Sequence, residues 1–272
     1  MPDLVAEPEE KKEEERQLGS MSLLQHLEEL RRRIIYALVA VVICAGASLW
    51  WVRDIYALIA KPVMVVLAKY KIDPHLVYQN PVEPVNLYMK VGLLAGLFIA
   101  SPVVLYQVWM FISPGLYRNE KRFVLPFLFL SVGLFLSGGY FGYKYVFPVA
   151  LDVMIGWYGS DFRAMITIGE YTKLFLTIIL GLSIIFELPI VLGFLAMMGV
   201  VNAKFLFRHI RGAVLFFFII AAILTPTTDI LNMTIYAAPM ILLYLMSIGL
   251  AWLVHPKQRR ARREKRQRQG SA

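Results

Sequence analysis

The chain has 272 residues, of which 58% are hydrophobic and 17% are charged, whereas average soluble domains are about 45–50% apolar and about 25% charged. The net charge is +9, but the basic residues flank apolar runs and fill a C-terminal tail, so no nucleic-acid-binding face is expected. One cysteine excludes a disulfide within the chain, and four scattered histidines give no zinc or haem pattern, so we expect no metal and no cofactor.

The two ends of the chain are polar. Residues 1–20 are acidic and lack the basic start and small-residue cleavage site of a signal peptide, so we predict a disordered segment followed by an uncleaved span. Residues 255–272 contain eight basic residues and one acidic residue, which predicts a solvated tail that also suits anionic lipid headgroups. The expected membrane domain therefore covers residues 21–254.

Six apolar runs lie within this membrane domain, at residues 34–52, 91–112, 123–143, 174–198, 212–224 and 235–254. A transmembrane helix needs about 20 residues to cross a hydrocarbon core about 30 Å thick, and the first four runs reach that length. The fifth run would form only roughly 20 Å of helix, so it either crosses a locally thinned bilayer or forms a re-entrant segment. We predict an all-α integral membrane protein with six spans, the last two short.

Basic residues predict the orientation of these spans. They gather before span one, between spans two and three, between spans four and five, and after span six. These four places lie on one side if every run crosses, and the positive-inside bias makes that side cytoplasmic. Both termini are then cytoplasmic.

The other side carries two longer connections. Residues 53–90 include apolar side chains at helical spacing, which predicts an amphipathic helix on the outer membrane surface. Those side chains are Ile55, Leu58, Ile59, Val63, Val66 and Leu67. The second outer loop is expected at residues 144–173.

Acidic residues next to the basic clusters have two interpretations. Glu28 and Glu29 stand one helical turn before Arg32 and Arg33, which is the spacing of simple ion pairs worth about 0.2–0.5 kcal/mol each. Glu120 lies among basic residues in the loop FISPGLYRNEKR (111–122) and could likewise be a paired loop charge. The carboxylate of Glu29 or of Glu120 could instead bind a cationic ligand.

Glu187 lies near the middle of span four, in SIIFELPIVLG. A carboxylate at the bilayer centre costs at least about 2.5–3.5 kcal/mol, so we favour a functional polar site over a purely structural one. Pro189, two residues later, predicts a kink. No span contains a histidine to act as a base, and no phosphate-binding or dinucleotide motif is present, so we expect no enzyme activity.

Five segments together resemble the TatC family, the multi-spanning subunit of the twin-arginine protein translocase. They are HLEELRRR (26–33), SPVVLYQVWMFISPGLYRNEKR (101–122), YVFPVA (145–150), FELPIVLG (186–193) and LTPTTD (224–229). The resemblance implies a concave six-span bundle that helps export folded proteins across the bacterial inner membrane, driven by the proton-motive force. LTPTTD has one residue more than the commoner LTPPD form, which leaves the geometry around Asp229 open.

The resemblance also implies site residues and partners. The signal-peptide-binding set is Glu29, Arg31, Phe111, Leu116, Tyr117, Glu120 and Arg122; Glu187 is the intramembrane polar position, and Pro62 and Asp229 are outer-side positions. Carboxylates at 29 and 120 would accept the paired arginines of the peptide, because a guanidinium matches a carboxylate in a bidentate geometry. TatA-type and TatB-type single-span subunits, and further copies of this chain, are the expected partners. The alternative is a proton-coupled small-solute transporter with Glu187 as proton relay.

Overall fold

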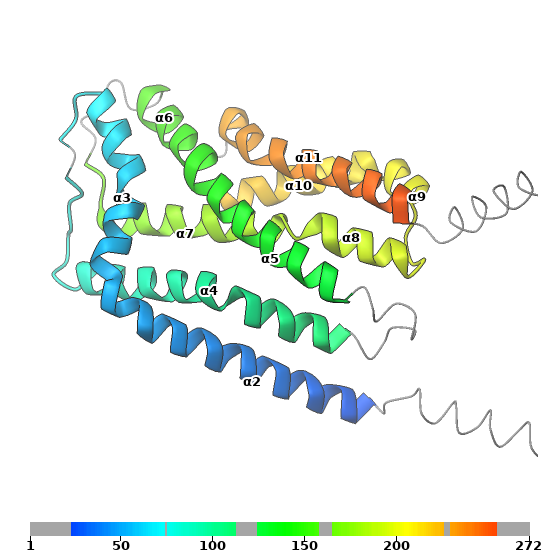
Figure 1. Cartoon of the computed structure of the whole chain (residues 1–272). Coiled ribbons are helices and arrows are strands. Elements are labelled where there is room, and N and C mark those ends of the chain that lie inside the picture. The colour runs from blue at the N-terminus through cyan, green and yellow to red at the C-terminus, as the bar shows by residue number, and fades with distance from the viewer. Residues whose placement is uncertain (1–22, 74, 113–123, 158–164, 226–228, 255–272) are drawn as a thin grey trace, which may run out of the picture.

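The computed structural model describes residues 23–73, 75–112, 124–157, 165–225 and 229–254 (Figure 1). Within these residues the regular elements are helices, apart from one isolated β-bridge between Val77 and Thr167. The helices are α2 (Leu23–Ser48), η1 (Leu49–Trp51), α3 (Val52–Lys69), α4 (Glu83–Ile112), α5 (Val124–Phe141), η4 (Gly142–Val146), α6 (Phe147–Trp157), α7 (Ile168–Ile185), α8 (Leu188–Met197), α9 (Ala203–Arg208), α10 (Ile210–Leu224) and α11 (Ile230–Val254).

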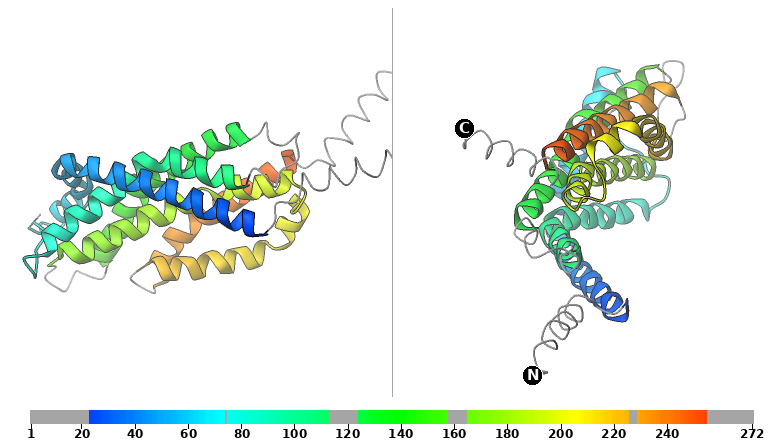
Figure 2. Two further views of the ribbon diagram at one scale, coloured as in Figure 1. Left: turned by 90° about the horizontal axis from the view of Figure 1, so that it is seen from below. Right: turned by 90° about the vertical axis from the view of Figure 1, so that its right-hand side faces the viewer.

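The helices form an elongated bundle with two distinct ends (Figure 1). At one end α3 lies across the bundle, and we call this the α3 end. At the other, the α9 end, α2 begins, α4 finishes, α5 begins and α8 finishes. Seen along its length, the bundle has α2 at its margin, packed against α4 (Figure 2).

Five helical segments are long and apolar enough to cross a membrane, which agrees with the expected all-α membrane architecture. These segments are Gln25–Lys69, Glu83–Ile112, Val124–Gly156, Ile168–Met197 and Ile230–Trp252. α10 corresponds to the expected fifth span and has 15 residues, which is about 22 Å of helix. The six crossings and their orientation remain predictions.

The expectation of a short sixth span is wrong, because α11 has 25 residues. The helix starts before the apolar run, since polar side chains in its first turns are bonded locally. Asp229 Oδ2 accepts a hydrogen bond from the Asn232 backbone N–H at 2.8 Å, and the Thr234 hydroxyl donates to the Ile230 carbonyl at 2.6 Å. Of the two membrane helices that were predicted to be short, α10 is short and α11 is not.

The fourth apolar run is broken as predicted. α7 ends at Ile185, and α8 begins at Leu188 with Glu187 as its N-cap residue. Pro189 has no N–H and fits the first turn of α8, where intrahelical donors are not needed. The carbonyl of Glu187 accepts the N–H of Ile190 at 3.0 Å, so the break places the Glu187 side chain at the start of a new helix.

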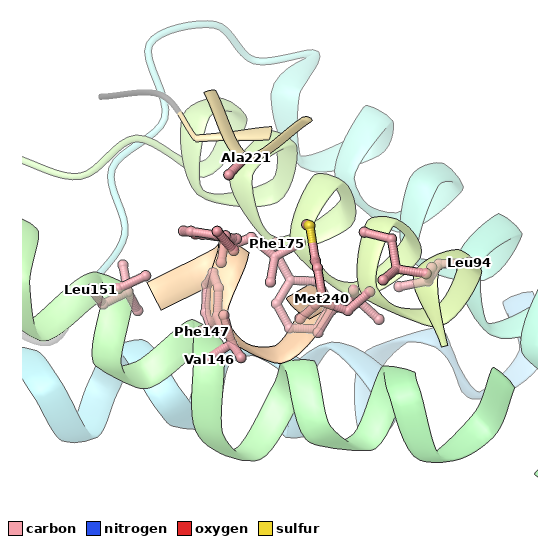
Figure 3. Close-up of a cluster of buried hydrophobic side chains, with 14 of the residues drawn as sticks. Leu94, Val146, Phe147, Leu151, Phe175, Ala221 and Met240 are labelled. Atoms are coloured by element: carbon pink, nitrogen blue, oxygen red, sulfur yellow. The ribbon is translucent and has the colours of Figure 1, made fainter. Parts of the chain in front are cut away.

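The second outer loop was expected to begin at residue 144, and this boundary is wrong. The chain stays helical through a π-helical turn, η4, and then α6 as far as Trp157. Burial of α6 explains the difference. Figure 3 shows Val146, Phe147 and Leu151 turned toward Phe175 of α7 and Met240 of α11.

The amphipathic helix expected after span one is confirmed as α3. Most of its apolar face packs on other helices of the protein. Val63 and Leu67 are fully buried in the main hydrophobic cluster, because α3 packs against α4 and α6. α3 is therefore an integral part of the bundle.

Candidate functional site

The α2–α4 contact sets the position of the first predicted site segment. α4 is approached closely at two glycines, because Gly92 faces Leu49 of η1 and Gly96 faces Ala45 of α2. A Cβ at Gly96 would lie 2.4 Å from the Cα of Ala45, so only glycine permits this approach. The two helices thus run side by side toward the α9 end (Figures 1 and 2), where the start of α2 meets the end of α4.

Two contacts join α2 to α4 at this corner. The rings of His26 and Phe111 are stacked, with centroids 4.4 Å apart and planes inclined by 20°. Two turns further along α2, Arg33 Nη1 donates a hydrogen bond to Gln107 Oε1 at 3.2 Å. Phe111 and Glu29, which belong to the same predicted binding set, are therefore brought to one corner.

The carboxylate of Glu29 is only half paired. Arg33 Nη2 donates to Glu29 Oε1 at 3.1 Å, and the two side chains are 17% (Arg33) and 11% (Glu29) exposed. This is the i,i+4 ion pair that the sequence spacing predicted. In the part of the chain that the structure describes, Glu29 Oε2 and Arg33 Nε are buried without a hydrogen-bond partner. The site therefore keeps an acceptor available for another donor.

A pocket of about 470 Å³ opens at this corner. The described residues that line it are Gln25, Glu28, Glu29, Arg31, Arg32 and Ile35. Glu28 and Arg31 are exposed, so the rim carries both signs of charge around the more buried carboxylate of Glu29. This arrangement suits a cationic ligand group, because the Glu29 carboxylate can hold the group in one position by a hydrogen bond as well as attract it by charge.

The remaining members of the predicted set, Leu116, Tyr117, Glu120 and Arg122, lie outside the described residues. Conversely, sequence reasoning missed two residues of the corner, His26 and Gln107. His26 is one turn before Glu29 on α2, and Gln107 is one turn before Phe111 on α4. Helical spacing from the predicted residues was the signal that could have identified both.

Glu187 forms a second polar site, separate from the corner. The hydroxyl of Ser131 on α5 donates a short hydrogen bond to Glu187 Oε2. Within the described residues, Glu187 Oε1 is buried and has no partner. Gly138 permits the close packing, because a Cβ there would lie 2.8 Å from the Cβ of Phe186. The half-buried side chain of Glu187 thus joins α5 to the break between α7 and α8, and Ser131 had no sequence signal.

The two predicted outer-side positions lie away from the Glu29 corner. Asp229 caps α11, since its Oδ1 also accepts from Asn232 Nδ2 at 3.0 Å. The extra residue in LTPTTD is thus compatible with an ordinary helix cap. Pro62 is buried inside α3. The structure therefore separates the predicted residues into a charged corner, a buried carboxylate and two helix-shaping positions.

Fold and sites together define a multi-pass helical membrane protein with a charged corner at its α9 end and a carboxylate held between its helices. The family described as Sec-independent protein translocase protein (TatC) matches residues 25–239. The chain belongs to the TatC family, and it is a membrane-spanning component of twin-arginine protein transport.

Individual relatives agree with this assignment. The Sec-independent protein translocase protein TatC of Koribacter versatilis is 58% identical over 252 residues, which is 93% of each chain. The Aquifex aeolicus protein of the same description is 34% identical, covering 88% of this chain and 98% of its own length. The crystal structure of the twin-arginine translocase receptor TatC is similar with a TM-score of 0.74 and 34% identity, covering 84% of this chain and 99% of the other.

Proposed function

We propose that this chain is the signal-peptide receptor and core scaffold of a twin-arginine translocase, which exports folded proteins across the bacterial inner membrane at the expense of the proton-motive force. The half-paired Glu29 carboxylate beside Phe111 carries the proposal. It offers a buried acceptor for a guanidinium, next to an aromatic ring that can contact the adjoining peptide. The similar crystal structure is described as a receptor.

The proposed binding mode uses both sides of the Glu29 carboxylate. Arg33 keeps Oε1, and an arginine of the peptide donates to Oε2. Gln107 restrains Arg33, so Arg33 is not free to take both oxygens. A hydrogen bond to a charged group contributes about 1.5–3 kcal/mol. A micromolar complex needs about 8 kcal/mol, so Glu120 and the apolar segment of the peptide supply the rest.

The same proposal places the α9 end in the cytoplasm. Arg31, Arg32 and Arg33 lie at the start of α2, and Lys204, Arg208 and Arg211 lie in α9 and at the start of α10. Both groups reach the same end of the bundle (Figure 1). Such clustering is typical of cytoplasmic loops. The bundle then has six crossings, with both termini cytoplasmic.

Glu187 is proposed as a contact for another subunit. Its Oε1 is buried and unpartnered among the described residues, so a polar side chain from a TatA-type or TatB-type single span would stabilise it. Further copies of this chain complete the proposed receptor complex, and anionic lipids bind the basic tail. No observation favours the small-solute transporter over these roles, since the family consists of protein translocases.

The receptor proposal is tested by binding a labelled twin-arginine signal peptide, and its lysine–lysine counterpart, to the purified protein in detergent. Binding should weaken about tenfold or more on the lysine swap, which corresponds to about 1.4 kcal/mol. Glu29→Gln and Glu120→Gln should each weaken the arginine peptide similarly. Glu170→Gln is the matched control, because it removes the same charge from an exposed position at the other end of the bundle. Equal binding by both peptides, or equal loss in the control, would refute the proposal.

A further inference from the structure

Pro62 lies in the interior of α3, where proline is unusual. In an α-helix each N–H binds the carbonyl four residues earlier, and proline has no N–H to donate. The carbonyl of Leu58 therefore has no helical partner at this turn. An unbonded backbone carbonyl is costly wherever water does not reach it, unless another donor binds it.

Tyrosine hydroxyls from two other helices reach this turn of α3. The Tyr143 hydroxyl donates to the Leu58 carbonyl at 2.8 Å. The Tyr171 hydroxyl donates to the next carbonyl, that of Ile59, at 2.7 Å. These tyrosines are 85 and 112 residues away in sequence from their acceptors, so both bonds are tertiary.

Both tyrosines are held by their surroundings. Tyr171 is only 2% exposed, and its ring meets the ring of Phe147 edge-on with centroids 5.4 Å apart. Tyr143 meets Phe175 edge-on at 6.4 Å. Tyr143 also belongs to the π-helical turn η4, and such turns change the direction in which the following side chains point.

We propose that Pro62 acts by leaving the Leu58 carbonyl of α3 free to accept a hydrogen bond from another helix. Tyr143 and Tyr171 are positioning residues, whose hydroxyls bind this turn of α3 to η4 and α7. The joint fixes α3 to η4, which continues α5 and its Ser131, and to α7, which ends two residues before Glu187. It therefore sets the α3 end of the two helices that share the buried carboxylate. This inference does not depend on the proposed signal-peptide site.

The test is a double-mutant cycle read by hydrogen exchange of the amides of residues 63–69 in the purified full-length protein. Tyr143→Phe removes only the hydroxyl and leaves the Leu58 carbonyl unbonded. We expect it to speed exchange by about fivefold or more, the ratio that corresponds to about 1 kcal/mol. In a Pro62→Ala background, residue 62 supplies its own N–H to Leu58. The same tyrosine substitution should then change exchange less than twofold.

Tyr145→Phe is the matched control, because Tyr145 lies in the same π-helical turn with an exposed side chain. Tyr171→Phe provides a second variant and should also speed exchange by about fivefold. The proposal is overturned if Tyr143→Phe behaves like the control, or if its effect is the same with alanine at position 62. Rescue by Pro62→Ala would support it, since a general loss of packing would not be corrected by one backbone N–H.

Discussion

The close approach of α2 and α4 makes a quantitative prediction for Gly96→Ala. An ordinary Cβ contact lies at 3.4–4 Å, and a Cβ at Gly96 would lie 2.4 Å from backbone atoms of Ala45. α2 must therefore move away by at least about 1 Å, and overpacking of this kind typically costs about 1–3 kcal/mol. Against this, alanine is a better helix former than glycine by about 1 kcal/mol.

Gly133→Ala separates these two effects. Gly133 is also inside an apolar helix, α5, but a Cβ there would meet nothing within 4 Å. The Gly133→Ala variant gains the higher helix propensity of alanine without a steric clash. The free energies of unfolding of the two variants should therefore differ by about the whole overpacking cost of 1–3 kcal/mol. The assay is thermal unfolding in detergent, where a difference of about 2–4 °C per kcal/mol is expected for a domain of this size.

The same displacement should weaken signal-peptide binding, because it separates Phe111 from His26 and Gln107 from Arg33. Gly133→Ala should leave binding unchanged. If Gly96→Ala stabilises the protein as much as Gly133→Ala does, then α2 does not rest on α4 as described, and the reasoning about the corner fails with it.

Two further substitutions test the other positions. Ser131→Ala removes the hydrogen-bond donor to Glu187 and should lower the free energy of unfolding by about 1–3 kcal/mol. Ser137→Ala is the control, because Ser137 is an exposed serine of the same helix and its removal should not lower stability. Equal thermal unfolding midpoints for the two variants would contradict the assigned bond. Asp229→Ala removes the cap of α11 and should cost about 0.5–2 kcal/mol, seen as faster amide exchange confined to the first turn of α11. Unchanged exchange there would show that the cap contributes nothing.

Run length and periodicity in the sequence were enough to predict most of the helices. Apolar runs of membrane length predicted an all-helical membrane protein, and helical spacing predicted α3. Pro189 predicted the break before α8, because a missing N–H acts locally whatever the helix packs against. Spacing of four residues likewise predicted the Glu29–Arg33 pair. All of these depend on neighbours within a turn or two.

Tertiary packing decided what lies outside that range. The helix of span three continues to Trp157 because α6 is buried against other helices. Arg33 and Gln107 are 74 residues apart, and the tyrosine bonds to α3 join still more distant segments. No sequence period encodes such pairs. The sequence by itself determined the helices and their charged ends, while only the packing of one helix on another determined which carbonyl, carboxylate or ring each side chain meets.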